Sequence, residues 1–153
     1  MNRRKKIAVF SSNIYEPILH SISQGINKAA AELDVKVIYF ISFSDSFSSN
    51  MYNQFTLYDE GDMVAFELPD LDDFDGVIRL DPTYGTFTKR TLDDRLVKSK
   101  IPIINVGGKD DRYYNILNNE AESFCNVIEH IINEHGCEDI YHIAGIKGKY
   151  FTE

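Results

Sequence analysis

Apolar residues occur in short continuous runs along the chain, separated by longer polar or mixed segments. Each run has the length of a β-strand, and its apolar residues follow one another instead of alternating with polar ones. Such runs are typical of parallel strands, because helices cover both faces of a parallel sheet. The predicted strands are Ile7–Phe10, Val35–Ile41, Gly76–Leu80, Pro102–Val106 and Ile140–Ala144, with a weaker candidate at Tyr114–Leu117.

Two stretches show the spacing of an amphipathic helix. The first follows the first apolar run, and Pro17 suits its first helical position. In the second, Asn118 or Asn119 is the predicted cap and Gly136 fits the end. A shorter helix is predicted at Thr91–Lys98. The two apolar stripes are Ile18, Ile22, Ile26, Ala29 and Leu33, and Phe124, Val127, Ile128, Ile131 and Ile132.

The alternation of strands and helices favours right-handed crossovers between parallel strands. We therefore expect the α/β class, as a three-layer α/β/α sandwich with a mainly parallel, doubly wound sheet. The segment Ser42–Asp75 departs from this pattern, because Ser, Asp, Asn and Gly are frequent and no clean helical stripe is present. Within it, Met51–Leu57 predicts a short helix and Met63–Leu68 predicts an extra edge strand.

Length and charge narrow the choice of partners. The 153 residues correspond to about one domain, with 43% hydrophobic residues and a net charge of -8. The basic residues beyond Arg3–Lys6 are scattered among acidic ones, which argues against a nucleic-acid backbone as partner.

Cellular location follows from what the sequence contains near its beginning and in its apolar segments. Only the short apolar run Ile7–Phe10 lies between the basic beginning and polar Ser11, which does not match a signal peptide, and no stretch is long enough to span a bilayer. We expect a cytoplasmic protein without membrane contact. Cys125 and Cys137 lack the CxxC spacing of metal sites and are interpreted as reduced thiols.

Polar and aromatic side chains follow the predicted strands at their carboxyl ends. Open parallel sheets bind ligands beyond those ends, so these residues are the candidates for a binding site. They offer hydroxyls, amides, carboxylates and aromatic rings, and this chemistry suits a sugar-like or otherwise polar small molecule. The same residue types also begin helices and form turns, which is the alternative interpretation. The candidate ligand-binding residues are Ser12, Asn13, Tyr15, Glu16, Ser42, Asp81 and Tyr84.

Several other chemistries of doubly wound proteins lack their signatures in this sequence. The turn after the first strand has no glycine, whereas a dinucleotide-binding unit needs GxGxxG there. Ser11 and Ser12 stand where a phosphoacceptor domain needs an acidic pair, and no GxSxG elbow is present. We therefore predict no cofactor and no catalytic residue for this chain.

Metal binding is the main alternative. Asp70–Asp75 carries closely spaced carboxylates that could hold calcium or magnesium, although it lacks the glycine turn and the distal Glu of an EF-hand loop. A solvated acidic turn is favoured over a metal-dependent enzyme. The histidines are His20, His130, His135 and His142, and none of them forms an i, i+4 pair. We therefore predict no metal site.

The segments "KIAVFSSNIYEP", "FDGVIRL", "IPIINVGG" and "ILNNEAESFCNVIEHIINEHGCEDIYHIAG" together resemble the ligand-binding domain shared by LacI-type regulators and type I periplasmic sugar-binding proteins. Pro17, Gly25, Gly76 and Asn119 match family positions. Asn118 stands where the family often has a ligand-contacting Asp, so the resemblance adds Asn118 to the candidate ligand contacts. Further matches are Ile26, Asp75, Gly136, Ile140, Ile143 and Gly145, whereas Glu16, Ile18 and Cys137 depart from the family pattern.

The resemblance implies an organisation and a role. Residues 1–136 would form the N-terminal lobe of a ligand-binding domain, and residues 137–153 would begin a truncated second lobe. The family's helix-turn-helix has no counterpart before the first strand, so we expect no direct contact with DNA. The implied function is a sensor of a small polar ligand that closes its lobes and acts on an effector such as a diguanylate cyclase or a kinase. A homodimer is expected, and the alternatives are a metal-dependent enzyme or a dimerisation module.

Overall fold

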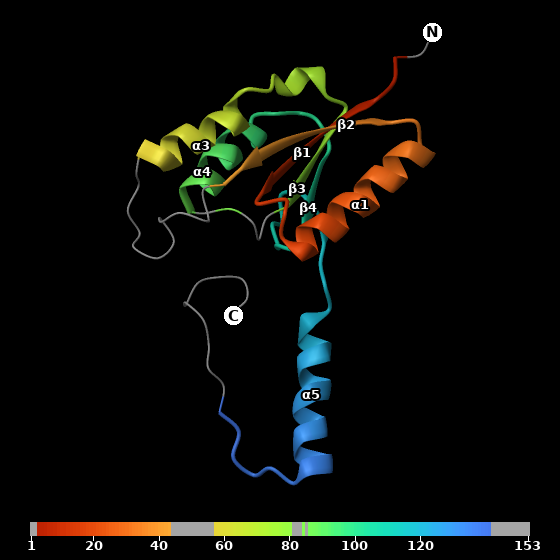
Figure 1. The fold of residues 1–153 in the computed structure, drawn as a ribbon, viewed down its shortest axis with the longest axis vertical. Helices are drawn as coiled ribbons and strands as arrows, with labels where there is room; N and C mark the ends of the chain where they lie inside the picture. Colours follow the sequence, from red (N-terminus) through yellow and green to blue (C-terminus); the bar gives the residue numbers. More distant parts are fainter. Residues whose placement is uncertain (1–2, 44–56, 81–83, 85, 142–153) are drawn as a thin grey trace. The chain divides into compact units, whose positions relative to one another are not determined.

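The structure is a computed structural model and describes residues 3–43, 57–80, 84 and 86–141 (Figure 1). Strands and helices alternate through most of this part of the chain. The elements are β1 (Lys6–Ser12), α1 (Pro17–Glu32), β2 (Lys36–Ser42), α3 (Leu57–Glu67), the 3-10 helix η2 (Leu71–Asp73), β3 (Gly76–Leu80), α4 (Thr86–Leu96), β4 (Ile103–Val106), β5 (Tyr114–Ile116) and α5 (Glu120–His135).

The strands form one five-stranded sheet in the order β2-β1-β3-β4-β5. Every neighbouring pair is parallel, and in this register Val9 lies opposite both Tyr39 of β2 and Ile78 of β3. The prediction of an α/β protein with a mainly parallel sheet is therefore confirmed. The weak candidate at Tyr114–Leu117 is also confirmed, because it forms the edge strand β5.

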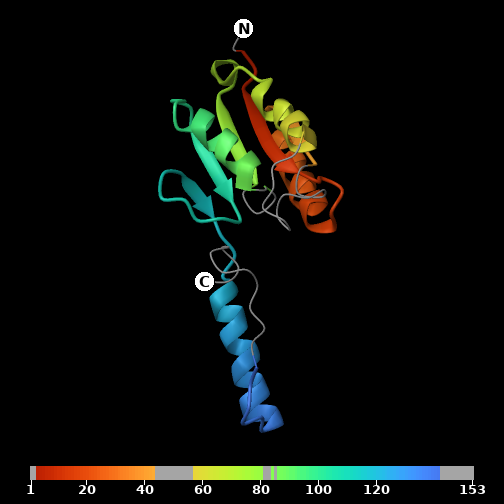
Figure 2. The ribbon, with the colours of Figure 1, turned by 90° about the vertical axis from the view of Figure 1, so that its left-hand side faces the viewer.

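Helices cover both faces of the sheet, an arrangement compatible with three α/β/α layers (Figure 1). On one face, Val9 and Leu80 pack with Leu19 of α1. Figure 2 shows α4 in front of the strands on the other face, where Phe66 and Leu92 pack on Phe10 and its neighbours. Neighbouring residues of β1 thus enter two different cores, which explains why its apolar run is continuous.

Helix α1 begins at Pro17, as predicted, and packs on the sheet through a set of residues that overlaps only partly with the predicted stripe. Leu19 and Ser23 are buried, whereas 74% of Ile18 is exposed. Ile22 and Ile26 of the predicted stripe do pack against the core. The contact face is therefore centred between Leu19 and Ile26, about one residue away from the predicted stripe.

The crossover between β2 and β3 contains a helix where an edge strand was predicted. Helix α3 spans Leu57–Glu67, so the predicted strand at Met63–Leu68 is wrong. The helix is stabilised by Phe66, which is fully buried and meets Phe10 edge-on at 5.3 Å between ring centroids. The predicted helix at Met51–Leu57 lies outside the described residues, except for Leu57, with which α3 begins.

Helix α4 also differs in its limits from the prediction. It spans Thr86–Leu96, so it begins earlier and ends earlier than the predicted Thr91–Lys98. Leu92 and Leu96 are buried and anchor it to the sheet. The residues that follow it, up to Pro102, form the connection to β4.

The chain divides into two compact units, Met1–Ile116 and Leu117–Glu153. In the second unit, α5 ends at Gly136, whose φ of 62° is left-handed, as the predicted stop requires. This division falls before α5, whereas the sequence places the lobe boundary after residue 136, and that boundary stays a prediction. Ile140 and Tyr141 are described and lie outside any strand; the rest of the run Ile140–Ala144 is outside the described residues. Among the described residues, no helix is both long and apolar enough to cross a membrane.

Candidate functional site

The strand order creates a topological switch point between β1 and β3. The chain leaves β1 through α1 toward β2 on one side, and it leaves β3 through α4 toward β4 on the other. The two connections lie on opposite faces of the sheet, and in open parallel sheets ligands bind beside the carboxyl ends of two strands related in this way. The candidate site is the carboxyl ends of β1 and β3 together with the adjoining end of β2, which we call the carboxyl-end rim.

Tyr84 links the ends of the two central strands. Its hydroxyl donates to the carbonyl of Phe10 at 2.5 Å and accepts from the amide of Leu80 at 3.0 Å. Phe10 lies opposite Arg79 in the register, so the Tyr84 hydroxyl sits where the parallel ladder of β1 and β3 would continue. The ring is buried and meets Phe66 edge-on. Tyr84 therefore joins the two strand ends from within the core, and its buried ring is not available to cover a ligand at the rim.

Buried hydroxyls form the inner part of the rim at β1 and β2. Ser12 and Ser42 lie opposite each other in the register, and both are buried. Ser11 is also buried, and its hydroxyl donates to the carbonyl of Ser12 at 3.1 Å. These three serines are shielded from water, so the inner part of the rim is both buried and polar.

The turn from β1 to α1 depends on the backbone of Asn13. Its φ is 44°, a left-handed conformation that asparagine tolerates better than most residues, so the turn needs no glycine. Its amide donates to the carbonyl of Ser42 at 3.0 Å, which ties the turn to the end of β2. The sequence "SSNIYEP" thus supplies a turn that begins on buried strands and ends at the first turn of α1.

The outer part of the rim carries an amide, a carboxylate and a phenol. The Asn13 side-chain amide donates to Glu16 Oε1 at 3.1 Å, and the Glu16 amide donates to the Asn13 carbonyl at 3.0 Å. Glu16 precedes α1 without a side-chain capping bond, so its carboxylate faces the turn instead. Tyr15 lies between them and is 80% exposed. The Asn13 and Glu16 side chains thus form a polar pair at the surface, and the phenol of Tyr15 is also exposed in the same turn.

Helix α3 contributes a residue that the sequence did not reveal. Asp62 Oδ2 accepts a hydrogen bond from the amide of Phe43, 3.1 Å away, just after β2 ends. The carboxylate thereby fixes the chain as it leaves the sheet. Asp62 could not be identified from the sequence, because the sequence predicted no helix there.

Two predicted contacts cannot be placed on this rim. Asp81 lies outside the described residues. Asn118 belongs to the second unit, where it lines a shallow hollow of about 360 Å³ with Asn119, Ser123, Phe124 and Val127. The structure therefore brings together Ser12, Asn13, Tyr15, Glu16, Ser42 and Tyr84 within the first unit.

A buried ion network lies on the α4 face near the same strand ends. Arg79 of β3 is fully buried, and its Nη1 lies 2.6 Å from Asp93 Oδ1 on α4 and 3.6 Å from Asp110 Oδ2. Opposite Arg79, Asn105 of β4 is also fully buried and donates to the carbonyl of Gly108 at 2.5 Å. The sequence contained one signal of this network, the arginine inside the apolar strand "GVIRL". A charge at a buried position requires a partner of opposite charge.

Arg112 links the two acids of this network. It donates from two nitrogens to Asp110, at 2.8 and 2.5 Å, and its Nη2 lies 3.4 Å from Asp93. The hydrogen bond from Arg112 holds the pKa of Asp110 below its ordinary value. At Asp93, burial raises the pKa and outweighs the attraction of Arg79. The network fastens α4 and the loop between β4 and β5 to β3.

The acidic segment Asp70–Asp75 lies at the opposite, amino end of β3. Asp70 accepts from the Asp72 amide at 3.1 Å, and Asp75 accepts from the Lys6 amide at 2.8 Å and pairs with Arg3 at 3.2 Å. These carboxylates therefore cap backbone groups and balance charge. In the part of the chain that the structure describes, no cluster of three or more metal-ligating side chains is present. His130 and His135 of α5 lie 3.2 Å apart between their Nε2 atoms.

The rim thus combines buried hydroxyls with an exposed amide, carboxylate and phenol. This donor and acceptor set can hold a polar molecule by hydrogen bonds, with an aromatic surface beside it. Comparison with known proteins adds no constraint: no protein-family model matches the sequence, and no curated protein matches it.

Proposed function

We propose that this chain binds a small polar ligand, such as a sugar, at the carboxyl-end rim and serves as the sensing domain of a regulatory or signalling protein. The observation that carries the proposal is the set of polar side chains of β1, β2 and the turn to α1 at the switch point, where Tyr84 joins the ends of β1 and β3. Sheets of this order bind ligands at that position.

The chemistry of the rim supports a ligand with several hydroxyls. The Glu16 carboxylate accepts from hydroxyl donors, and the Asn13 side chain both donates and accepts. Because these two groups already bond each other at 3.1 Å, they are held in place before a ligand arrives. A preorganised pair of this kind loses less conformational entropy when a ligand binds.

The resemblance to LacI-type and periplasmic sugar-binding domains supports the finer proposal that the first unit is the N-terminal lobe of such a domain. Its order of strands and helices agrees with a doubly wound lobe that carries its ligand site at the strand ends. In this proposal a second lobe closes over the ligand. Closure acts as a switch because the ligand binds the closed form better than the open form. The effector would be a diguanylate cyclase or a kinase, and this chain itself would have no catalytic role.

A thermal-shift screen of the protein in its natural full-length form tests this proposal. Sugars, nucleosides, amino acids and divalent ions would be compared at equal concentrations. A concentration-dependent rise in Tm with one class of polar organic molecule is the expected result, because a ligand that binds only the folded state stabilises it. Stabilisation by calcium or magnesium alone would support a metal-dependent enzyme. A dimer without any ligand response would support a dimerisation module.

A further inference from the structure

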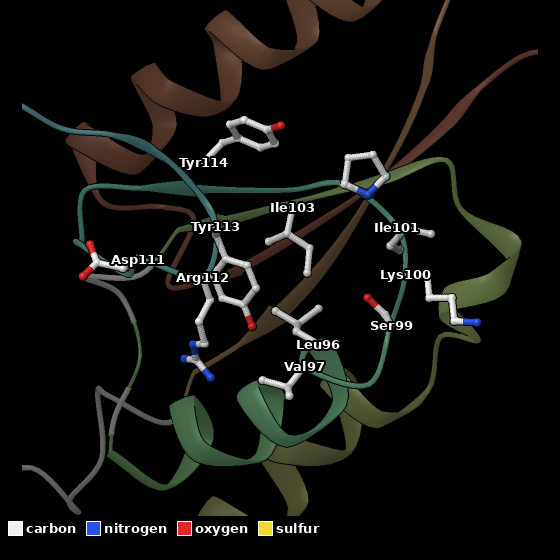
Figure 3. A pocket seen from close by; sticks show the side chains of 11 residues that line it. Leu96, Val97, Ser99, Lys100, Ile101, Ile103, Asp111, Arg112, Tyr113 and Tyr114 are labelled. Carbon is white, nitrogen blue, oxygen red and sulfur yellow. The ribbon is translucent and has the colours of Figure 1, made fainter.

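The first unit contains a cavity of about 600 Å³, lined by the residues that connect α4 to β4 and by those that lead into β5. Figure 3 shows its lining side chains, among them Leu96, Ile103 and Tyr113. The hydroxyls of Ser99 and Tyr113 are buried beneath other atoms, so a molecule in the cavity would not reach them. The cavity therefore indicates no ligand, whereas a pair of histidines in the second unit does.

The carboxyl end of α5 carries two histidines whose side chains meet. The Nε2 atoms of His130 and His135 lie 3.2 Å apart, and their ring centroids lie 5.0 Å apart. Both residues are exposed, so a ligand can reach them from solvent. The spacing of five residues is longer than the i, i+4 spacing of a helical metal-binding pair, so the sequence did not indicate this contact.

The backbone that carries this pair is fixed by the way the helix ends. The amide of Gly136 donates to the carbonyl of Ile132 at 3.0 Å, and the amide of Cys137 donates to the carbonyl of Ile131 at 3.4 Å. Gly136 has the left-handed conformation that such a helix end requires. His135 therefore occupies a defined position directly before the cap.

The distance between the two nitrogens fits a tetrahedral metal ion. Zinc binds histidine nitrogen at about 2.0–2.1 Å, and two ligands of a tetrahedral ion then lie about 3.3–3.4 Å apart. The observed 3.2 Å agrees with this value within the tolerance of about 0.2 Å that metal sites show. A right angle between the two bonds, as in square-planar or octahedral sites, would bring the nitrogens to about 2.8–3.0 Å.

The orientation of the rings supports the same interpretation. Two imidazoles that bind one tetrahedral zinc ion have ring centroids about 5 Å apart. A head-on hydrogen bond between nitrogens at the same separation would instead place the centroids about 5.5 Å apart. The observed centroid separation of 5.0 Å therefore indicates that the two Nε2 atoms converge on a point beside the line that joins them.

Charge around the pair also favours a cation. Residues 117–141, the described part of the second unit, contain no lysine or arginine. The carboxyl end of a helix carries partial negative charge, which attracts a cation. The acidic residues of this range are Glu120, Glu122, Glu129, Glu134, Glu138 and Asp139. A divalent cation at the two imidazoles would therefore be attracted by its surroundings.

We propose that His130 and His135 form a zinc site, in which both Nε2 atoms bind the ion and water fills its remaining positions. Each imidazole would carry its proton on Nδ1, which leaves Nε2 free to bind the metal. Two protein ligands hold zinc less tightly than the three or four of catalytic and structural sites, so the ion should exchange readily. It would clamp the carboxyl end of α5. The site lies in the second unit and does not depend on the sensing role of the rim.

Zinc chloride, added to the full chain, is the probe. The imidazole nitrogens would be observed by long-range ¹H–¹⁵N correlation NMR. The Nε2 signals of His130 and His135 should shift together and reach saturation, while the signal of His20, an exposed histidine of α1, should stay in place. Magnesium chloride at the same concentration should shift none of them, because magnesium prefers oxygen ligands.

His130→Gln and His135→Gln each remove one ligand of the proposed ion. Loss of a group that only supports a metal ligand already costs about 10–100-fold in affinity, so loss of a ligand itself should weaken zinc binding by at least about tenfold. The signal of the remaining histidine would report this loss. His20→Gln is the matched control and should bind zinc like the unmodified chain.

Three results would overturn the proposal. The first is no zinc-dependent shift at His130 and His135, which includes the case of zinc held only by the thiol of Cys125 or Cys137. The second is an equal shift with magnesium, which would show only a general attraction of cations to the acidic surface. The third is an undiminished zinc affinity in either glutamine variant of the pair.

Discussion

The hydroxyl of Tyr84 lies 2.5 Å from the carbonyl oxygen of Phe10, at the point where β1 and β3 separate. The same hydroxyl accepts from the amide of Leu80, so one side chain serves both central strands. The bond spans 74 residues of sequence and lies in the buried core. It holds together the two strand ends at the proposed ligand site.

Replacement of Tyr84 by phenylalanine should destabilise the first unit by about 1–2 kcal/mol, because two buried backbone groups lose the partner that this hydroxyl supplies. The ring remains and keeps its contact with Phe66. Equilibrium urea unfolding would measure the change. Tyr15→Phe is the control, since that tyrosine is exposed and its hydroxyl should contribute nothing to stability. Equal stabilities for the two variants would contradict the role of Tyr84.

Asp93→Asn should also destabilise the fold. The charge of Arg79 is fully buried, and its Nη1 lies 2.6 Å from the Asp93 carboxylate. Loss of one partner of a buried ion pair usually costs about 3–5 kcal/mol, and we expect a smaller cost of about 1–2 kcal/mol here, because burial disfavours the Asp93 carboxylate itself and Asp110 lies 3.6 Å from the same nitrogen. The neighbouring exposed residue provides the control: Asp94→Asn should change the unfolding free energy by less than about 0.5 kcal/mol. A similar small effect at Asp93 would show that the network does not stabilise the fold.

The pH dependence of stability should depend on Asp110. Its folded pKa is lowered by the hydrogen bond from Arg112, so its ionised form stabilises the fold above the unfolded pKa of about 3.9. That contribution decreases as the pH falls through the folded pKa. The unfolding free energies of the unmodified chain and Asp110→Asn should therefore differ by a constant amount above about pH 5 and converge below about pH 4. Asp93 does not add to this acid loss, because its pKa is raised.

Denaturant titrations between pH 3 and pH 7 would locate the pH at which the two unfolding free energies converge to within about one pH unit. Asp111→Asn is the matched control. Asp111 is the exposed neighbour of Asp110, and among the described contacts Arg112 donates its side-chain hydrogen bonds to Asp110 and not to Asp111. A difference between Asp110→Asn and the unmodified chain that stays constant down to the lowest pH would contradict the assignment.

The sheet could be predicted from the sequence because its signal is local. Continuous apolar runs such as those of β1 and β3 predict buried parallel strands, and all five described strands lie at predicted positions. Helix α3 could not be predicted in the same way. Its single deeply buried anchor, Phe66, produces no helical stripe, and the polar segment around Gly61 favours a loop.

The candidate site could be predicted in outline, because the residues that follow parallel strands are known from the sequence order alone. The contacts that these residues make could not be predicted from the sequence. Tyr84 follows β3 in the sequence, yet its bond to Phe10 depends on how two distant strands separate. Arg79 was visible as a charge in an apolar strand, but its partners lie on α4 and on the loop after β4, and only the folded chain identifies them.

The most direct test of the sensing role is an isothermal titration of the molecule that gives the largest Tm rise in the screen. It would be titrated into the full-length protein and into Glu16→Gln, which keeps the shape of the side chain and removes its charge. The account predicts that Glu16→Gln weakens binding by about tenfold or more, as expected when a charged acceptor is lost from a ligand contact. Glu32→Gln, an exposed change at the far end of α1, should bind like the unmodified protein. Equal affinities for all three proteins would contradict a ligand site at the carboxyl-end rim.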